Sequence, residues 1–110
     1  MAYDEELAER VREVVAGEDA LHEQRMFGGL AFLVAGKMAV AASGRDGLMV
    51  RVDPAESGAL ESADGVEPMV MRGREMHGWL LVSNEAVRDD AALEEWVARG
   101  VSYARSLSRT

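Results

Sequence analysis

The stretch Arg25-Met26-Phe27-Gly28-Gly29-Leu30-Ala31-Phe32 decides the fold of this chain. Two large apolar side chains lead into two adjacent glycines, and a strand pattern follows. Because glycine lacks a Cβ, Gly28 and Gly29 can take a positive φ or lie close to another segment at little cost. Phe27 is expected to be buried. The stretch indicates a bend at the entrance to a sheet, and it carries no signature of a reaction centre.

Three strands are predicted from these glycines onward. Residues 30–34 alternate bulky and smaller side chains, which is typical of a strand. Gly36 separates them from a second apolar run, residues 37–42, and this spacing predicts a hairpin. After a turn at residues 43–47, residues 48–52 form the third strand. The residues before the glycines carry a weaker signal for a short strand that begins near Gln24. This strand is not included among the predicted strands.

Helices are predicted on both sides of this meander. Residues 4–16 place apolar side chains at helical spacing, with Asp and Glu at the amino end where the helix dipole favours them. Asp53-Pro54-Ala55-Glu56 is a helix start, with Asp53 as the N-cap and Pro54 in the first turn. This helix is expected to end near Ser62.

The remaining elements are predicted to be two strands and a long helix. Residues 66–71 form a strand in which Pro68 indicates either an edge position or the first residues of the strand, and residues 76–82 form another. The last helix begins near Asp89 or Asp90 and continues toward Leu107, with Trp96 on its apolar stripe. Gly100 interrupts this stripe, and close contact with a strand would explain it.

The predicted fold class is therefore α+β, with one domain over residues 1–110. The order helix, three strands, short helix, two strands, helix predicts a two-layer arrangement with an antiparallel five-stranded sheet. A chain of 110 residues with 48% hydrophobic residues can fill one core.

Composition excludes several classes of function. The chain has no cysteine, which rules out disulfides and thiolate chemistry and fits the cytoplasm. No signal peptide or membrane-spanning apolar run is visible. Because the net charge is −8 and no basic block occurs, direct nucleic-acid binding is not expected.

Two surfaces are candidates for binding a partner. The first is a sheet face of small residues, Ala31, Ala39 and Ala41, on which a helix, a second subunit or a ligand could pack. The alternative is a sheet covered by its own chain. The second surface is the segment from Arg25 to Gly29, including Phe27.

The residues that could carry chemistry have simpler structural explanations. His22 and His77 match no ligand or catalytic spacing, so no catalytic residue, metal site or cofactor is predicted. Arg51 is a candidate for binding a carboxylate or another anion, although pairing with a nearby acid such as Glu56 is the plainer explanation. The seven methionines indicate either core filling or an adaptable binding surface.

The pattern resembles a known family. The carrying residues are Arg25-Met26-Phe27-Gly28-Gly29, Gly36-Lys37-Met38, Leu48-Met49-Val50-Arg51, Gly78-Trp79, and Leu93 with Trp96-Val97. Together they resemble the N-terminal domain family of the TfoX (Sxy) proteins, over roughly Leu7 to Leu107. The Met-Phe-Gly-Gly run is the most specific of these features.

The resemblance implies an antiparallel sheet with helices, similar to secretion-chaperone-like folds. In the best-known members it implies a regulator of bacterial competence genes that works with a cyclic-AMP-receptor-type transcription factor. Those members carry a second domain that these 110 residues do not contain, so the competence role is not carried over.

The expected function is accordingly a non-enzymatic regulatory module that binds protein partners, with a transcription factor as one candidate partner and a homodimer as a side hypothesis. The alternative is a small-molecule-binding domain or minor enzyme with a pocket near Arg51 and His77.

Overall fold

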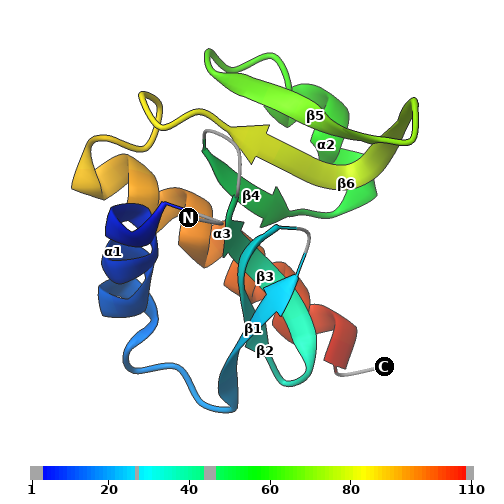
Figure 1. The fold of residues 1–110 in the computed structure, drawn as a ribbon. Helices are drawn as coiled ribbons and strands as arrows, with labels where there is room; N and C mark the ends of the chain where they lie inside the picture. The colour runs from blue at the N-terminus through cyan, green and yellow to red at the C-terminus, as the bar shows by residue number, and fades with distance from the viewer. Residues whose placement is uncertain (1–3, 27, 44–46, 109–110) are drawn as a thin grey trace.

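The computed structural model describes residues 4–26, 28–43 and 47–108 of the chain (Figure 1). Its elements follow one another in the order α1 (Glu5–Val15), β1 (Leu21–Met26), β2 (Gly29–Val34), β3 (Lys37–Ala42), β4 (Leu48–Arg51), α2 (Pro54–Leu60), β5 (Val66–Met71), β6 (Arg74–Val82) and α3 (Asp90–Ser108). The predicted combination of helices with an antiparallel sheet is confirmed.

The number of strands was predicted wrongly. Over the described residues the sheet has six strands rather than five, in the order β1-β2-β3-β4-β6-β5, and every neighbouring pair is antiparallel. The additional strand is β1, which pairs with β2 from Leu21↔Val34 to Met26↔Gly29. Its sequence, LHEQRM, lacks a regular alternation of apolar and polar residues because β1 is an edge strand with largely exposed side chains.

The first helix is fixed at its amino end and along one face. The Asp4 carboxylate accepts a hydrogen bond of 3.1 Å from the Leu7 amide, which satisfies a donor that the helix itself leaves unpaired. The face that α1 buries consists of Leu7, Ala8, Val11 and Val15. The periodicity of these residues is what the sequence pattern predicts.

The main hydrophobic core lies where the helices pack on one face of the sheet. α1 and α3 contact each other and both contact β3, and α3 also packs on β2 and β4 (Figure 1). Gly100 lies where α3 crosses β3, and a Cβ on it would overlap the Ala39 carbonyl oxygen. Close contact with a strand therefore explains this glycine, as predicted. The largest fully buried side chains include Phe32, Leu48, Leu80 and Leu93.

The sheet narrows at its centre. β3 and β4 share only the pairs Val40↔Val50, Ala41↔Met49 and Ala42↔Leu48, and Arg51 has a partner on β6 but none on β3. In Figure 1 the strands on either side of this junction run in clearly different directions. A register shift between Phe32 and Leu33 also changes which residues of β3 share a face.

Candidate functional site

A second hydrophobic cluster lies on the sheet face opposite the main core. Ala31, Met38, Ala41 and Met49 are buried in it, and Leu33, Met69 and Trp79 pack against them. Because side chains alternate along a strand, Ala31 points away from the face that Leu30 and Phe32 share. All seven residues belong to strands, so we call this the strand-face cluster.

The strand-face cluster reaches the surface through its outer members. Leu33, Met69 and Trp79 are half-buried, while the four residues beneath them are buried. Met76 lies opposite Met69 in the β5–β6 register, which places it on the same face, and it is 36% exposed. The strand-face cluster is thus a small hydrophobic core whose solvent-facing side is apolar and accessible.

Arg51 adjoins this cluster at the end of β4. Its Cζ lies 4.9 Å from the centroid of the Trp79 ring, and Trp79 is its partner on β6. The Tyr103 ring of α3 is 5.9 Å from the same atom. Within the described residues no carboxylate lies within 4.0 Å of this guanidinium, so the anticipated pairing with Glu56 is absent there.

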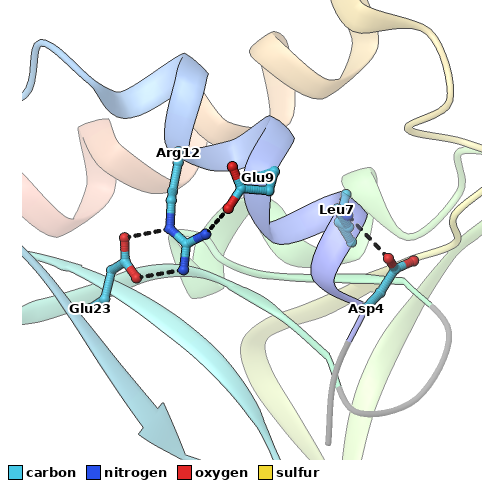
Figure 2. A network of polar contacts seen from close by, with 5 residues as sticks. All are labelled: Asp4, Leu7, Glu9, Arg12 and Glu23. Carbon is cyan, nitrogen blue, oxygen red and sulfur yellow. Dashed lines mark hydrogen bonds and ion pairs between the residues drawn. The ribbon is translucent and has the colours of Figure 1, made fainter. Parts of the chain in front are cut away.

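Arginines on the helical side of the molecule behave differently. Arg12 donates to both carboxylate oxygens of Glu23 at 2.8 and 2.9 Å, and this pair joins α1 to β1 (Figure 2). Arg12 also pairs with Glu9 on its own helix. The hydrogen bonds that Arg12 donates and Glu23 accepts lower the pKa of Glu23 and raise the pKa of Arg12. Arg105 similarly donates to Glu18 at 2.7 Å. The acidic residues before and within β1 thus serve as structural partners.

A groove lies between the start of α2 and the second half of α3. Its volume is about 270 Å³, and its walls are Val52, Asp53, Glu56, Arg99, Ser102, Tyr103 and Ser106. Tyr103 is shared with the surroundings of Arg51. Arg51 is not among the residues that line this groove, and the pocket expected near Arg51 and His77 stays a prediction.

The predicted face of small residues is divided between the two sides of the sheet. Ala31 and Ala41 belong to the strand-face cluster, but Ala39 belongs to the main core beneath α3. The prediction that the three share a face is wrong, because the register shift in the β2–β3 pair turns Ala39 toward the helices. All three are buried at 2% exposure or less.

The Arg25–Gly29 segment forms the β1–β2 connection. Gly28 has φ of 72°, as its position in a tight turn requires, whereas Gly29 begins β2 and is buried. Arg25 extends from the edge strand with an exposed side chain. Phe27 lies outside the described residues. This segment and the strand-face cluster are therefore separate surfaces, although β2 contributes to both.

The two histidine positions are not brought together. His22 is on β1 and residue 77 is on β6, with three strands between these two in the sheet order. Among the residues that the structure describes, no three His, Asp or Glu side chains gather as metal ligands do. Within the same residues, no helix has the length and apolar character needed to cross a membrane.

Sequence reasoning missed the aromatic neighbours of Arg51. Trp79 and Tyr103 carried no signal for a site, because their proximity depends on the β4–β6 register and on the path of α3. The alternation in Leu48-Met49-Val50-Arg51 does place Arg51 on the same face as Met49. That was the one available signal that this arginine adjoins an apolar surface.

Comparison with known proteins gives one clear result. Residues 13–104, from α1 into the last turns of α3, match the family model of the TfoX N-terminal domain. The chain belongs to the TfoX N-terminal domain family. No curated protein matches the chain. For this TfoX N-terminal domain the match includes all six described strands, so both the strand-face cluster and Arg51 lie inside the family region.

Proposed function

We propose that this TfoX N-terminal domain is a non-enzymatic regulatory module of the cytoplasm that binds a protein partner through the strand-face cluster. The observation that supports this most is an apolar surface made by strands alone, next to an arginine without a counterion in the described residues. Exposed apolar surface with polar residues at its rim is typical of protein interaction sites.

The methionines suit this surface. Met49 and Met38 fill its base, while Met69 and Met76 are accessible above. A thioether side chain is flexible and polarizable, so it adapts to the shape of a partner. Regulation of transcription through a bound transcription factor is the role that the family suggests for such a module, and it forms part of the proposal.

The test is affinity capture from the native cell with matched baits. Met76→Glu places a charge on the apolar surface, and Ala91→Glu adds the same charge at an exposed position of α3. The wild type and Ala91→Glu should recover the same protein, and Met76→Glu should recover much less of it. Equal recovery by all three baits would contradict the proposed surface.

A small-molecule-binding domain or minor enzyme is the second candidate function. The groove beside Tyr103 favours it, because polar residues line it from both helices: Ser102, Ser106 and Arg99 on α3, and Asp53 and Glu56 at the start of α2. Its volume of about 270 Å³ is slightly below the usual range for drug-sized ligands. A thermal-shift screen of metabolites in which Ser102→Leu abolishes a stabilising hit would favour this function over the first.

A further inference from the structure

We infer that Arg51 anchors an acidic side chain of the partner protein, and that apolar residues beside that acid cover the strand-face cluster. This inference rests on the proposed function and adds the chemistry of the partner segment. The segment is a peptide in which Asp or Glu stands next to large apolar residues.

The Arg51 guanidinium lies in an aromatic environment. It is half-buried and lies near two aromatic rings, at 4.9 Å from Trp79 and 5.9 Å from Tyr103. Aromatic faces attract the guanidinium but are weak hydrogen-bond acceptors, so its donor edge stays available to a stronger acceptor. A carboxylate is the group that matches this fork with two parallel hydrogen bonds.

Arg51 differs from the arginines of α1 and α3. Arg10, Arg12, Arg99 and Arg105 each pair with a carboxylate, and each lies on α1 or α3. Arg51 is the sole arginine within the described strands β2, β3 and β4, and within the described residues it has no such pair. The pairs of Arg10, Arg12 and Arg105 join α1 or α3 to other segments, whereas the donors of Arg51 are left for another molecule.

The central strands of the sheet carry little charge, and that charge is positive. β2, β3 and β4 contain no acidic residue, and their only charged side chains are Lys37 and Arg51. The overall charge of −8 therefore comes from other elements. Asp53 and Glu56 are the nearest acids after Arg51 in the chain; Asp53 caps α2, and both face the groove beside α3. Arg51 is therefore the charged side chain of these three strands that adjoins the strand-face cluster, and an acid that reaches it meets no carboxylate from β2, β3 or β4.

Trp79 connects Arg51 with the strand-face cluster. Trp79 stacks near Arg51 and also packs in the strand-face cluster with Met49 and Met69. A peptide whose acid reaches Arg51 therefore places its neighbouring side chains over Trp79 and the methionines. Burial of that apolar surface supplies affinity, and the forked hydrogen bond fixes the position of the peptide.

The experiment uses a short synthetic peptide in which leucines are flanked by glutamates, titrated into the full chain. Its control is the same peptide with glutamine in place of glutamate. Two-dimensional NMR of the ¹⁵N-labelled protein follows the Trp79 indole N–H, the Arg51 Nε–H and the backbone amides. We expect the acidic peptide to shift these two side-chain signals and amides of β4 and β6, and the glutamine peptide to bind about tenfold more weakly or worse.

Protein variants identify the arginine responsible. Arg51→Gln should weaken the acidic peptide by about tenfold or more and should leave the glutamine peptide unchanged, as in a double-mutant cycle. Arg88→Gln removes the same charge from an exposed position before α3 and should bind as the wild type does. Arg51→Lys keeps the positive charge but cannot form the forked pair of hydrogen bonds, so it should lose less affinity for the acidic peptide than Arg51→Gln does. If Arg51→Gln does not fold, Arg51→Lys is compared with the wild type instead.

Several results would overturn the inference. Equal affinities for the two peptides, equal affinities of Arg51→Gln and Arg88→Gln, or shifts confined to the helices would each do so. Inorganic phosphate or duplex DNA that binds through Arg51 more tightly than the peptide would assign the arginine to another ligand class. If the peptides fail but partner capture still depends on Met76, only the acidic character is wrong; if both fail, the proposed function falls as well.

Discussion

Single residues in special backbone positions set the turns of this fold, and Gly28 is the one that the sequence marks most clearly. It has φ of 72° between β1 and β2, in a region that side chains with a branched Cβ strongly disfavour. Open space surrounds the position where its Cβ would lie, so the backbone conformation alone creates the requirement.

Gly28→Val should therefore lower the free energy of unfolding by more than about 1 kcal/mol. Urea denaturation followed by circular dichroism measures this loss. Gly58→Val serves as the control, since residue 58 has ordinary helical geometry with open space around its Cβ and should lose mainly helix propensity. A Gly28→Val protein as stable as the wild type would contradict the strained turn.

At the same scale, the sequence identified Arg51 but not its surroundings. Alternation along β4 places its side chain on the face of Met49, and this is visible in the sequence. Its stacking on Trp79 depends on a strand pairing across α2 and β5, which a local pattern does not encode. The face of Ala39 was predicted wrongly, because the prediction assumed regular alternation along β3. The register shift in the β2–β3 pair breaks this alternation, and no sequence signal marks it.

At the scale of elements, α3 and β3 pack in close contact. A methyl group on Gly100 would overlap the Ala39 carbonyl oxygen and lie 2.9 Å from Val40 Cγ1. The oxygen belongs to a strand at the centre of the sheet, so it has little freedom to move aside.

Gly100→Ala tests this packing, because two effects oppose each other. Alanine gains about 1 kcal/mol of helix propensity, whereas overpacking of a close contact costs about 1–3 kcal/mol. We expect the packing cost to exceed the gain and the melting temperature to fall. Gly58→Ala in α2 has no neighbour within 4 Å and should be neutral or stabilising in the same calorimetric measurement.

The ion pair between α1 and β1 makes part of the stability depend on pH. Because Arg12 lowers the pKa of Glu23, the pair contributes above the ordinary pKa of a glutamate and is lost as the pH falls through the lower folded value. The stability difference between the wild type and Glu23→Gln should thus be present at neutral pH and disappear well below about pH 4. Denaturation curves at several pH values measure it, and a constant difference would exclude this linkage.

The helices and the hairpin strands were predictable because each carries its own local signal. The apolar spacing of α1, the Asp53 cap of α2 and the turn at Gly36 all appear in the structure. β1 has only a weak signal near Gln24, since a polar edge strand is held by backbone hydrogen bonds to β2 rather than by a buried face. Edge strands of this kind escape pattern-based prediction for that physical reason.

For the whole molecule, the distribution of charge decides which partners it meets. The chain has a net charge of −8, and α1 begins with exposed Glu5 and Glu6. Phosphate groups of nucleic acid are repelled by such a field, and binding to them depends on releasing counterions through cationic side chains.

The domain alone should accordingly give no retarded band with duplex DNA in a gel-shift assay at low salt. A basic DNA-binding domain in the same gel provides the positive control. A band that weakens steeply as salt is added would show direct binding and contradict this expectation.

The position of α3 in the chain also has a consequence for biosynthesis. This helix supplies Leu93, Trp96, Val97 and Ala104 to the main core, yet the ribosome makes it after every strand on which it packs. Until it emerges, the part of the apolar sheet face that α3 covers stays exposed. A stalled chain ending before Asp90 should therefore be held by chaperones or cleaved by proteases, and release of the helix is the event that makes the newborn protein durable.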